Sequence, residues 1–308
     1  MVILLNKNAC AGKAEIKWNR IQNAIRKMVG EYTLVESNDS AKILLLDELR
    51  KGEQKFIAAG GDGTVNFMLN TLAENIEPEQ LKQIQIGAIG LGSSNDFYKP
   101  FNKEKFIDSI PCRLDFNNTV LHDLGKVNWI DEQKKELCNY WINNASIGVT
   151  AEANCLFNYP NKFLKSLKKK NSNQAIVYTA VKTILTYKNI WVDVSCDRAT
   201  PRTTEITNLG IVKNPNFSGS FCYDSPYTRN SGLFYVHTCV GMTIPQTLGV
   251  LYNLSQGRFT GSKNTRSYKA SVVNIKSSKI FAVEFDGEVV CTNQAAFSLI
   301  KNGVQLCV

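Results

Sequence analysis

Hydrophobic and polar positions in the first third of the chain repeat a strand–helix order. Short apolar runs at Val2–Leu5, Lys55–Ala59 and Ile84–Ile89 have the length of buried strands. Apolar residues spaced three and four apart predict one helix over Trp18–Met28. The same spacing predicts another helix that starts at the glycine-rich segment before Val65 and continues through Val65. Because strands and helices alternate, the pattern predicts a parallel α/β sheet with ligand-binding loops at the carboxyl ends of its strands.

From about Arg113 onward the pattern changes to short, β-branched segments separated by turns. These segments are Val120–Val127, Cys138–Asn144, Ile190–Cys196, Glu205–Val212, Gly232–Val240, Val272–Ile275, Ile280–Phe285 and Phe297–Leu299. They predict a mainly antiparallel sheet, interrupted by helices at Ser172–Tyr187 and Pro245–Leu254. We therefore predict an α/β domain over residues 1–113 and a β-rich domain over residues 114–308, whose last residues can pack back on the first.

Charge divides the chain in a similar way. Residues 1–152 hold 20 acids and 18 bases, whereas residues 153–308 hold 7 acids and 18 bases. An acid-free stretch holds lysines at 162, 165, 168, 169, 170, 182 and 188, and apolar residues at 156, 157, 163, 164 and 167 are interleaved with its start. Bases with apolar residues at helical spacing are typical of an interfacial amphipathic helix on anionic lipid. The alternative is an ordinary solvated face. Nucleic acid is a weaker interpretation, because the aromatic residues form no recognisable stacking surface, and we predict no nucleic-acid partner.

Other classes of protein are excluded by what the sequence lacks. No apolar run approaches the roughly 20 residues of a membrane-spanning helix. The start, Met1–Asn6, has no basic segment before its apolar residues, unlike a secretory signal. The nine cysteines are scattered without a C-x-x-C pair, and His122 and His237 are the two histidines, so a disulfide framework or zinc site is disfavoured. These features predict a cytoplasmic protein.

Two glycine-rich loops carry the chemistry. The first, Gly60-Gly61-Asp62-Gly63-Thr64, follows a predicted strand and opens a helix, where backbone N–H groups can approach phosphate. A carboxylate in such a loop is repelled by phosphate unless a metal lies between them or it accepts a proton, so Asp62 is a candidate for either role. The second loop, Gly92–Asp96, follows the next strand. The alternative for both loops is a tight, capped turn.

Taken together, these loops resemble the diacylglycerol kinase catalytic-domain family. The resemblance rests on the first loop followed by Asn66, on Asn95-Asp96-Phe97 in the second, and on three later segments. Those segments are Asp123–Lys126, Asn143–Gly148 and Asp286-Gly287-Glu288. The resemblance implies an N-terminal domain like that of NAD kinase and phosphofructokinase, followed by an antiparallel β domain.

It also implies a kinase that transfers the γ-phosphate of ATP to a hydroxyl of a membrane lipid, such as diacylglycerol or a sphingoid base. The residues implied to hold the nucleotide are Asn6, Gly12, Ser37, Gly60, Gly61, Asp62, Gly63, Thr64, Asn66, Ser93 and Asn95. Asp62, Asp96 and Asp123 are the implied Mg²⁺ ligands. Asp62 is also implied in catalysis, and either Asp286 or Glu288 would accept the hydroxyl proton; we favour Glu288.

The sequence departs from the family at informative positions. Phe67 stands where the family has Glu, and Cys10 stands where it has the first loop glycine. Asn230 and Ser231 replace two carboxylates that bind a structural magnesium in soluble bacterial members, so we predict that this metal site is absent. Two alternatives stay open: an NAD-kinase-like phosphotransferase on a soluble substrate, and a nucleotide or lipid sensor without turnover. The expected partners are the lipid substrate and an anionic membrane surface with peripheral association; a homodimer stays open.

Overall fold

The computed structural model describes residues 1–100 and 105–308, which form two compact units. The first unit comprises residues 1–124 and 301–308, and the second comprises residues 125–300. The chain passes from one to the other inside two strands, β7 (Thr119–Ile130) and β17 (Glu288–Cys307). The boundary that the sequence predicts, after residue 113, lies before β7. In the structure the chain changes unit inside β7, between residues 124 and 125.

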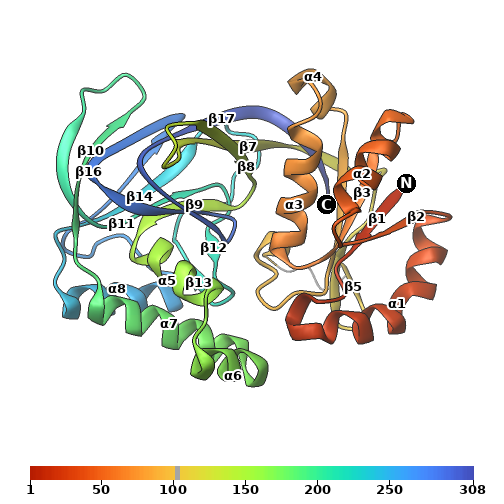
Figure 1. The fold of residues 1–308 in the computed structure, drawn as a ribbon, viewed down its shortest axis with the longest axis horizontal. Helices are drawn as coiled ribbons and strands as arrows, with labels where there is room; N and C mark the ends of the chain where they lie inside the picture. The colour runs from red at the N-terminus through yellow and green to blue at the C-terminus, as the bar shows by residue number, and fades with distance from the viewer. Residues whose placement is uncertain (101–104) are drawn as a thin grey trace. The chain divides into compact units, whose positions relative to one another are not determined.

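A parallel sheet forms the centre of the first unit, as the alternating pattern predicted. Its strands are β1 (Val2–Leu5), β2 (Thr33–Glu36), β3 (Lys55–Gly60) and β4 (Gln85–Gly90). Strand β1 lies between β2 and β3, and β4 lies beside β3, all parallel (Figure 1). Beside β4 the sheet is extended by two segments. Gln305–Leu306 of β17 pairs with β4 in parallel, and β6 (Ile110–Arg113) pairs with it antiparallel. Strand β5 (Phe106–Ile107) pairs with β6.

Helices cover this sheet because each carries an apolar stripe. Helix α1 (Lys13–Val29) buries Trp18, Ile21 and Ile25 in one cluster with the strand residues Ile3 and Ile57. The other helices of this unit are α2 (Ala41–Arg50), α3 (Asp62–Ala73) and the short α4 (Pro78–Leu81). Helices α2 and α3 contact each other, and α3 packs on β3. Right-handed crossovers place α1 on one face and α2 and α3 on the other.

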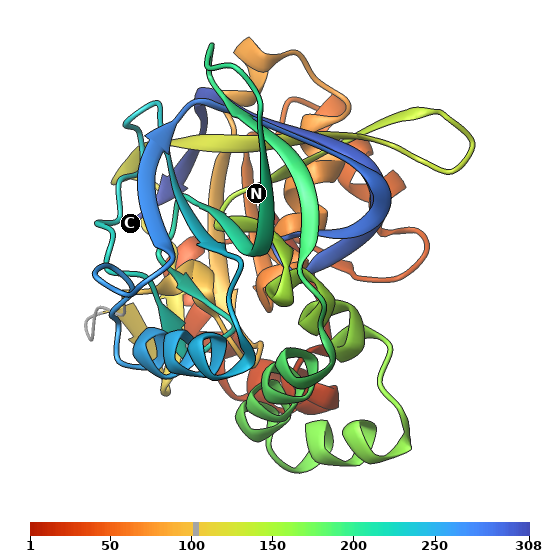
Figure 2. The ribbon, with the colours of Figure 1, turned by 90° about the vertical axis from the view of Figure 1, so that its left-hand side faces the viewer.

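The second unit is a mainly antiparallel sheet, also as predicted. Its strands besides β7 and β17 are β8 (Glu136–Trp141), β9 (Asn144–Gly148), β10 (Ile190–Cys196), β11 (Arg202–Val212), β14 (Phe234–Val240), β15 (Thr265–Ala270) and β16 (Val272–Phe285). The strand order is β15-β14-β11-β10-β16-β17, and β9 pairs with both β11 and β16. Figure 2 shows how strongly these strands curl. A separate small sheet joins β12 (Asn216–Phe217) and β13 (Phe221–Cys222).

Four helices accompany this sheet: α5 (Val149–Asn158), α6 (Lys162–Lys170), α7 (Ser172–Thr186) and α8 (Ile244–Ser255). The basic and apolar residues of the predicted amphipathic segment are divided between the end of α5 and the whole of α6. The chain breaks at Pro160, which has no backbone N–H to donate, and Asn161 caps α6 by accepting a hydrogen bond from Leu164 N at 2.9 Å. No helix in residues 1–100 or 105–308 is long and apolar enough to cross a membrane.

Candidate active site

The two glycine loops lie where the strand order of the first unit reverses. The chain moves outward from β1 to β2 on one side and from β3 to β4 on the other, so the carboxyl ends of β1 and β3 flank a switch point, the usual ligand position in such sheets. Strand β1 leads into Asn6, whose backbone N–H donates to Ala59 O at 2.9 Å. The Asn6 amide nitrogen lies 3.3 Å from Thr64 Oγ1 in the first glycine loop. The predicted nucleotide residues Asn6 and Thr64 therefore meet.

Direct backbone packing joins the two glycine loops. A Cβ added to Gly92 would lie 2.4 Å from the Cα of Gly61, far inside van der Waals contact. Two hydrogen bonds also join the loops: Leu91 N and Gly92 N donate to Gly60 O at 2.8 and 3.1 Å. Helix α3 begins at Asp62 beside this contact, so its first N–H groups and its dipole favour an anion here. The two loops thus form one continuous backbone surface.

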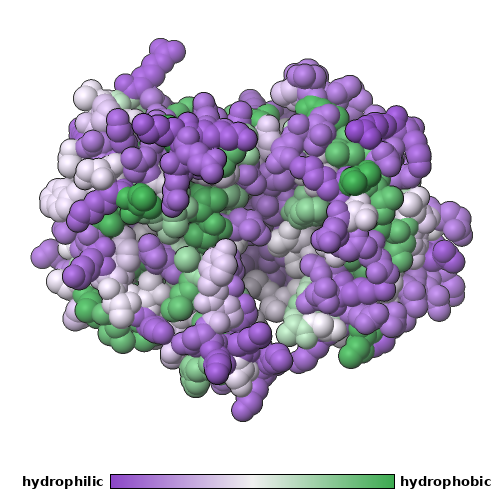
Figure 3. Space-filling view, viewed as in Figure 1, coloured by the Kyte–Doolittle hydropathy of each residue, from purple (hydrophilic) through white to green (hydrophobic). Residues whose placement is uncertain are grey.

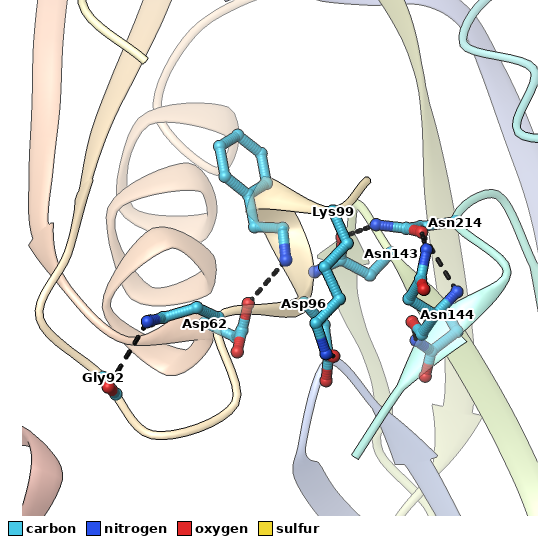
Figure 4. A network of polar contacts seen from close by, with 10 residues as sticks. Asp62, Gly92, Asp96, Lys99, Asn143, Asn144 and Asn214 are labelled. Atoms are coloured by element: carbon cyan, nitrogen blue, oxygen red, sulfur yellow. Dashed lines mark hydrogen bonds and ion pairs between the residues drawn. The ribbon is translucent and has the colours of Figure 1, made fainter. Parts of the chain in front are cut away.

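Asp62 is held in place by the second loop. Its Oδ1 accepts a hydrogen bond from Phe97 N at 2.8 Å (Figure 4). The neighbouring Asp96 pairs with Lys99 across 2.8 Å, and the two side chains are only 9% and 12% exposed. Asp62 is therefore oriented by a neutral backbone donor, whereas the negative charge of Asp96 is met by its own lysine.

Asn95 contributes an unsatisfied oxygen to this region. It adopts a left-handed conformation, φ 50°, and its amide nitrogen donates to Gly90 O at 3.1 Å and to Gly92 O at 3.4 Å. Its Oδ1 is buried and, within the described part of the chain, has no hydrogen-bond partner. A buried acceptor without a donor is unfavourable, so this atom is suited to a ligand that supplies a donor or a cation.

Lys17 is a feature of the loops that the sequence did not reveal. Its ammonium lies 3.3 Å from Leu91 O and 3.5 Å from Gly92 O, which places a positive charge beside the second loop. Lys17 belongs to no motif; its one sequence signal is its place early in the helix that follows the Asn6–Gly12 loop. It is a candidate phosphate contact.

Three other predicted nucleotide residues take varied positions. Ser37 follows β2 and donates its N–H to Leu5 O at 2.8 Å, so it lies at the same carboxyl edge of the sheet. Gly12 has φ 86°, and Cys10 and Ala11 before it also have positive φ, which strains these non-glycine residues. Asn66 is buried, and its Oδ1 accepts a hydrogen bond from Asn70 one turn later at 3.0 Å.

The three predicted Mg²⁺ ligands do not form one carboxylate cluster. Asp123 lies in β7, is fully buried, and accepts a hydrogen bond from Asn302 N at 2.9 Å. In the described ranges, no group of three His, Cys, Asp or Glu side chains could hold a metal ion. Asp62 and Asp96 do lie together at the glycine loops, whereas Asp123 anchors residues 301–308 to the first unit.

In the second unit, Asp286 joins two of the predicted motifs. Its carboxylate accepts three backbone hydrogen bonds, from Ile142 N at 2.7 Å, Asn143 N at 2.9 Å and Asn144 N at 3.2 Å. Asn143 Oδ1 in turn accepts from Asn214 Nδ2 at 3.3 Å (Figure 4). Both oxygens of Asp286 are therefore engaged in holding the chain before β9.

Glu284 is a buried carboxylate that the sequence analysis missed. It is 2% exposed, accepts a hydrogen bond from Ser146 Oγ at 2.7 Å, and accepts another from Gly287 N at 2.8 Å. The pairing of β9 with β16 sets Glu284 opposite Ser146. The available signal was an acid inside an otherwise apolar strand.

Glu288 has a different environment from these two acids. It is the first residue of β17, and its side chain is exposed. Across residues 1–100 and 105–308, no hydrogen bond or ion pair of this carboxylate is found. Of the two acids in the Asp286–Glu288 segment, Glu288 is therefore the one with an exposed carboxylate.

The turn at Asn230–Ser231, where the family resemblance puts a structural magnesium, holds a lysine instead. Lys213 is 1% exposed, and its ammonium lies 3.4 Å from Ser231 Oγ and 3.1 Å from Leu233 O. An ammonium group beside these oxygens already supplies a positive charge, and a second cation there would be repelled. The residues at this turn therefore do not fit the structural magnesium.

Comparison with known proteins agrees with the geometry of the first unit. Residues 1–127 match the family model described as diacylglycerol kinase catalytic domain. Mitochondrial acylglycerol kinase from Xenopus laevis is 31% identical over 94 residues, which are 30% of this chain and 22% of that protein. The human protein of that name is 26% identical over 137 residues, 42% of this chain and 32% of the relative.

Solved structures extend the likeness to the whole fold. A putative diacylglycerol kinase from Bacillus anthracis aligns with a TM-score of 0.72 and 16% identity, covering 99% of this chain and 94% of that one. Yeast NADH kinase, solved with NADH, aligns with a TM-score of 0.51 and 11% identity, covering 99% and 81%. The predicted fold class is confirmed. The matched stretch spans only about a fifth to a third of the length of these curated relatives.

Proposed function

We propose that this protein is a lipid kinase, which transfers the γ-phosphate of ATP to a hydroxyl of a membrane lipid. The observation that carries the proposal is the contact of Gly61 with Gly92 at the start of α3, which leaves backbone N–H groups and Asp62 on one surface. Phosphoryl transfer depends on positioning and on neutralising charge more than on covalent chemistry. A backbone surface of this kind suits the phosphates of a nucleotide.

Mg²⁺ is proposed as the ion that accompanies ATP. The donor set fits it, because Asp62 offers a carboxylate and Asn95 offers a buried amide oxygen without a partner in the described ranges, and Mg²⁺ prefers oxygen ligands. When bound, the ion would neutralise phosphate charge. Lys17 and the N-terminus of α3 would bind the phosphates themselves.

The proposed proton acceptor is Glu288, and Asp286 is a positioning residue. The support is their different surroundings: Asp286 accepts three backbone hydrogen bonds, whereas Glu288 is exposed on β17. A general base needs an accessible lone pair and typically contributes 10²- to 10⁴-fold to the rate. The lipid hydroxyl would lose its proton to Glu288 as it bonds to the γ-phosphorus, and the bond from that phosphorus to the β,γ-bridging oxygen would break to release ADP.

We propose further that α6, α7 and α8 bind an anionic membrane. Large apolar side chains are exposed there: Tyr159 (77%), Phe163 (59%), Val177 (45%), Leu185 (55%) and Tyr252 (64%). Lysines at 162, 165, 169, 170, 182 and 188 lie in the same segment, which holds no acid between Glu152 and Asp193. Figure 3 shows hydrophobic surface among hydrophilic residues over this part of the second unit. Such mixed surfaces bind lipid headgroups.

The kinase proposal is tested with labelled ATP, Mg²⁺ and vesicles that carry diacylglycerol, monoacylglycerol or a sphingoid base, with NAD as a soluble acceptor in parallel. We expect a labelled lipid, and a loss of at least 100-fold in kcat/KM for Asp62→Asn, since charge neutralisation near the phosphates is lost. Asp47→Asn is the matched control, because this half-exposed acid of α2 pairs with Arg50 of the same helix, away from the glycine loops. Label in NAD alone would establish the soluble phosphotransferase, and ATP binding without any turnover would establish the sensor.

A further inference from the structure

A second concave site lies in the second unit, among residues with no role in the proposed phosphoryl transfer. It is a cavity of about 390 Å³ formed by β10, β11, β14 and β15. Its principal lining residues are Val194, Ile206 and Val240, which are apolar, and Arg202, Arg266 and Tyr268, which are polar. We refer to it as the strand-end pocket. Its volume lies at the lower end of the range for small-molecule sites.

The sheet register explains why these side chains face one another. Val194 pairs with Arg202, and Ile206 pairs with Val240. Arg202 and Ile206 are four residues apart on β11, so both lie on the same face of the sheet. Strands β10 and β15 are not neighbours in the sheet, yet Cys196 Sγ lies 3.6 Å from the Tyr268 hydroxyl. The curl of the sheet, visible in Figure 2, therefore closes these strands around a concave space. The apolar lining is continuous with the core, since Ile206 is 1% exposed.

The pocket carries positive charge that is not compensated locally. Arg202 and Arg266 are both exposed, and neither forms an ion pair within the described ranges. No acid lines the pocket. Of the acids on the same strands and hairpin, Asp193 accepts a hydrogen bond from Thr203 Oγ1 at 2.5 Å, and Asp197 accepts one from Ser271 N at 2.9 Å. Glu205 of β11 is not among the residues that line the pocket. The two guanidinium groups are thus available for an anion.

We propose that the strand-end pocket binds a single-chain lipid with a phosphomonoester head. Arg202 and Arg266 hold the phosphate, because a guanidinium donates paired hydrogen bonds that match phosphate oxygens. Val194, Ile206 and Val240 receive the start of the alkyl chain. A phosphomonoester carries close to two negative charges near neutral pH, which matches two arginines better than a carboxylate does. A cavity of this size favours one chain over two.

This inference deepens the proposed function, since a phosphomonoester lipid is the class of product that a lipid kinase releases. Its position among residues outside the phosphoryl-transfer machinery makes the pocket a product-sensing or product-retaining site. Binding requires no catalysis, so the two proposals fail separately. The Asp62→Asn variant, inactive as a kinase under the proposed function, is expected to bind the lipid phosphate as the wild type does.

The test is calorimetric titration of the whole chain with dodecyl phosphate below its micelle concentration, with dodecanol and inorganic phosphate as the other two ligands. We expect dodecyl phosphate to bind, and Arg202→Gln/Arg266→Gln to weaken it roughly tenfold or more, the effect of losing charge-assisted hydrogen bonds. Lys263→Gln/Lys279→Gln, which removes two other exposed bases, is the matched control and is expected to bind normally.

Several outcomes would overturn the proposal. Unchanged binding in the double arginine variant would remove the phosphate from this pocket. Inorganic phosphate that binds as tightly as dodecyl phosphate would show an anion site without a lipid component, and dodecanol that does so would show an apolar site without phosphate recognition. Val240→Trp, which fills the apolar end while leaving both arginines, supplies an independent check: it is expected to weaken dodecyl phosphate and leave any residual phosphate binding unchanged.

Discussion

The two units build their candidate sites from different materials. In the first, the ligand-facing surface is mostly backbone: Gly61 and Gly92 touch at their Cα positions, and α3 begins beside them. In the second, the site is built from side chains. Asp286 accepts hydrogen bonds from backbone N–H groups just before β9, and Glu284 accepts one from a hydroxyl group of β9. A backbone site tolerates no added atoms, whereas a side-chain site tolerates no lost acceptor. The comparison teaches which kind of substitution each unit should fail to tolerate.

The largest expected effect is that of one methyl group in the first unit. Gly92→Ala places a Cβ 2.4 Å from the Cα of Gly61, so the two loops must separate. We expect nucleotide binding to weaken at least 100-fold and unfolding free energy to fall by about 3 kcal/mol, at the upper end of overpacking costs. Gly249→Ala in α8 is the control, since nothing lies within 4 Å of its added Cβ. Titration with an ATP analogue measures the effect; normal affinity in Gly92→Ala would refute the backbone surface.

The next prediction separates the two acids of the second unit. Asp286→Asn converts one acceptor oxygen to a donor that faces backbone N–H groups, and we expect a loss of about 2–3 kcal/mol in unfolding free energy. Glu288→Gln should leave stability within about 0.5 kcal/mol, as for other exposed positions, while kcat falls at least 100-fold. Urea unfolding and labelled-ATP turnover measure the two quantities. Full activity in Glu288→Gln would transfer the base role elsewhere.

Acid sensitivity should be concentrated in the second unit. Burial lowers the pKa of His237 to about 4, and nearby Asp224 opposes this only in part. A histidine whose pKa is lower when folded than when unfolded contributes stability above about pH 6.5, and this contribution is lost as the pH falls toward 4. We expect a loss of up to about 3 kcal/mol between pH 7.5 and pH 4. His237→Phe should flatten this part of the stability curve; an unchanged curve would assign it to carboxylates.

A smaller effect is expected at the buried lysine of the second unit. Lys213→Met keeps the length of the side chain but removes the donor to Ser231 and Leu233, which costs about 1–3 kcal/mol. Chelators should leave the melting temperature of the wild type unchanged. If EDTA lowers that temperature while Lys213→Met does not, a metal rather than the lysine holds this turn.

The sequence predicted local features well and distant pairings badly. Helical and strand periodicities are local properties of the sequence, so the parallel sheet could be predicted. Both glycine loops could be predicted as well, because each is a short continuous segment of the chain. Lys17, Lys213 and Glu284 were missed because their partners are defined only by packing and sheet register. Only Phe297–Leu299 of the long strand β17 was predicted, since seven of the ten residues in its first half are exposed or half-exposed. Pro160 separates α5 from α6, and this break could have been predicted from the sequence because proline disfavours a helix interior.

Residues 301–308 set a limit on how this protein can be divided into fragments. They lie in the first unit, where Gln305 N donates to Ile84 O at 3.0 Å and Asn302 N donates to Asp123. A recombinant piece cut at the end of the family match, residue 127, would lose these donors and expose the edge of β4 at Gln85–Ile86, while β6 still pairs with Ala88 and Ile89. An unpaired edge strand invites intermolecular pairing. We therefore expect residues 1–127 alone to be less stable than the same residues supplied with a 301–308 peptide, as urea unfolding of the two samples would measure.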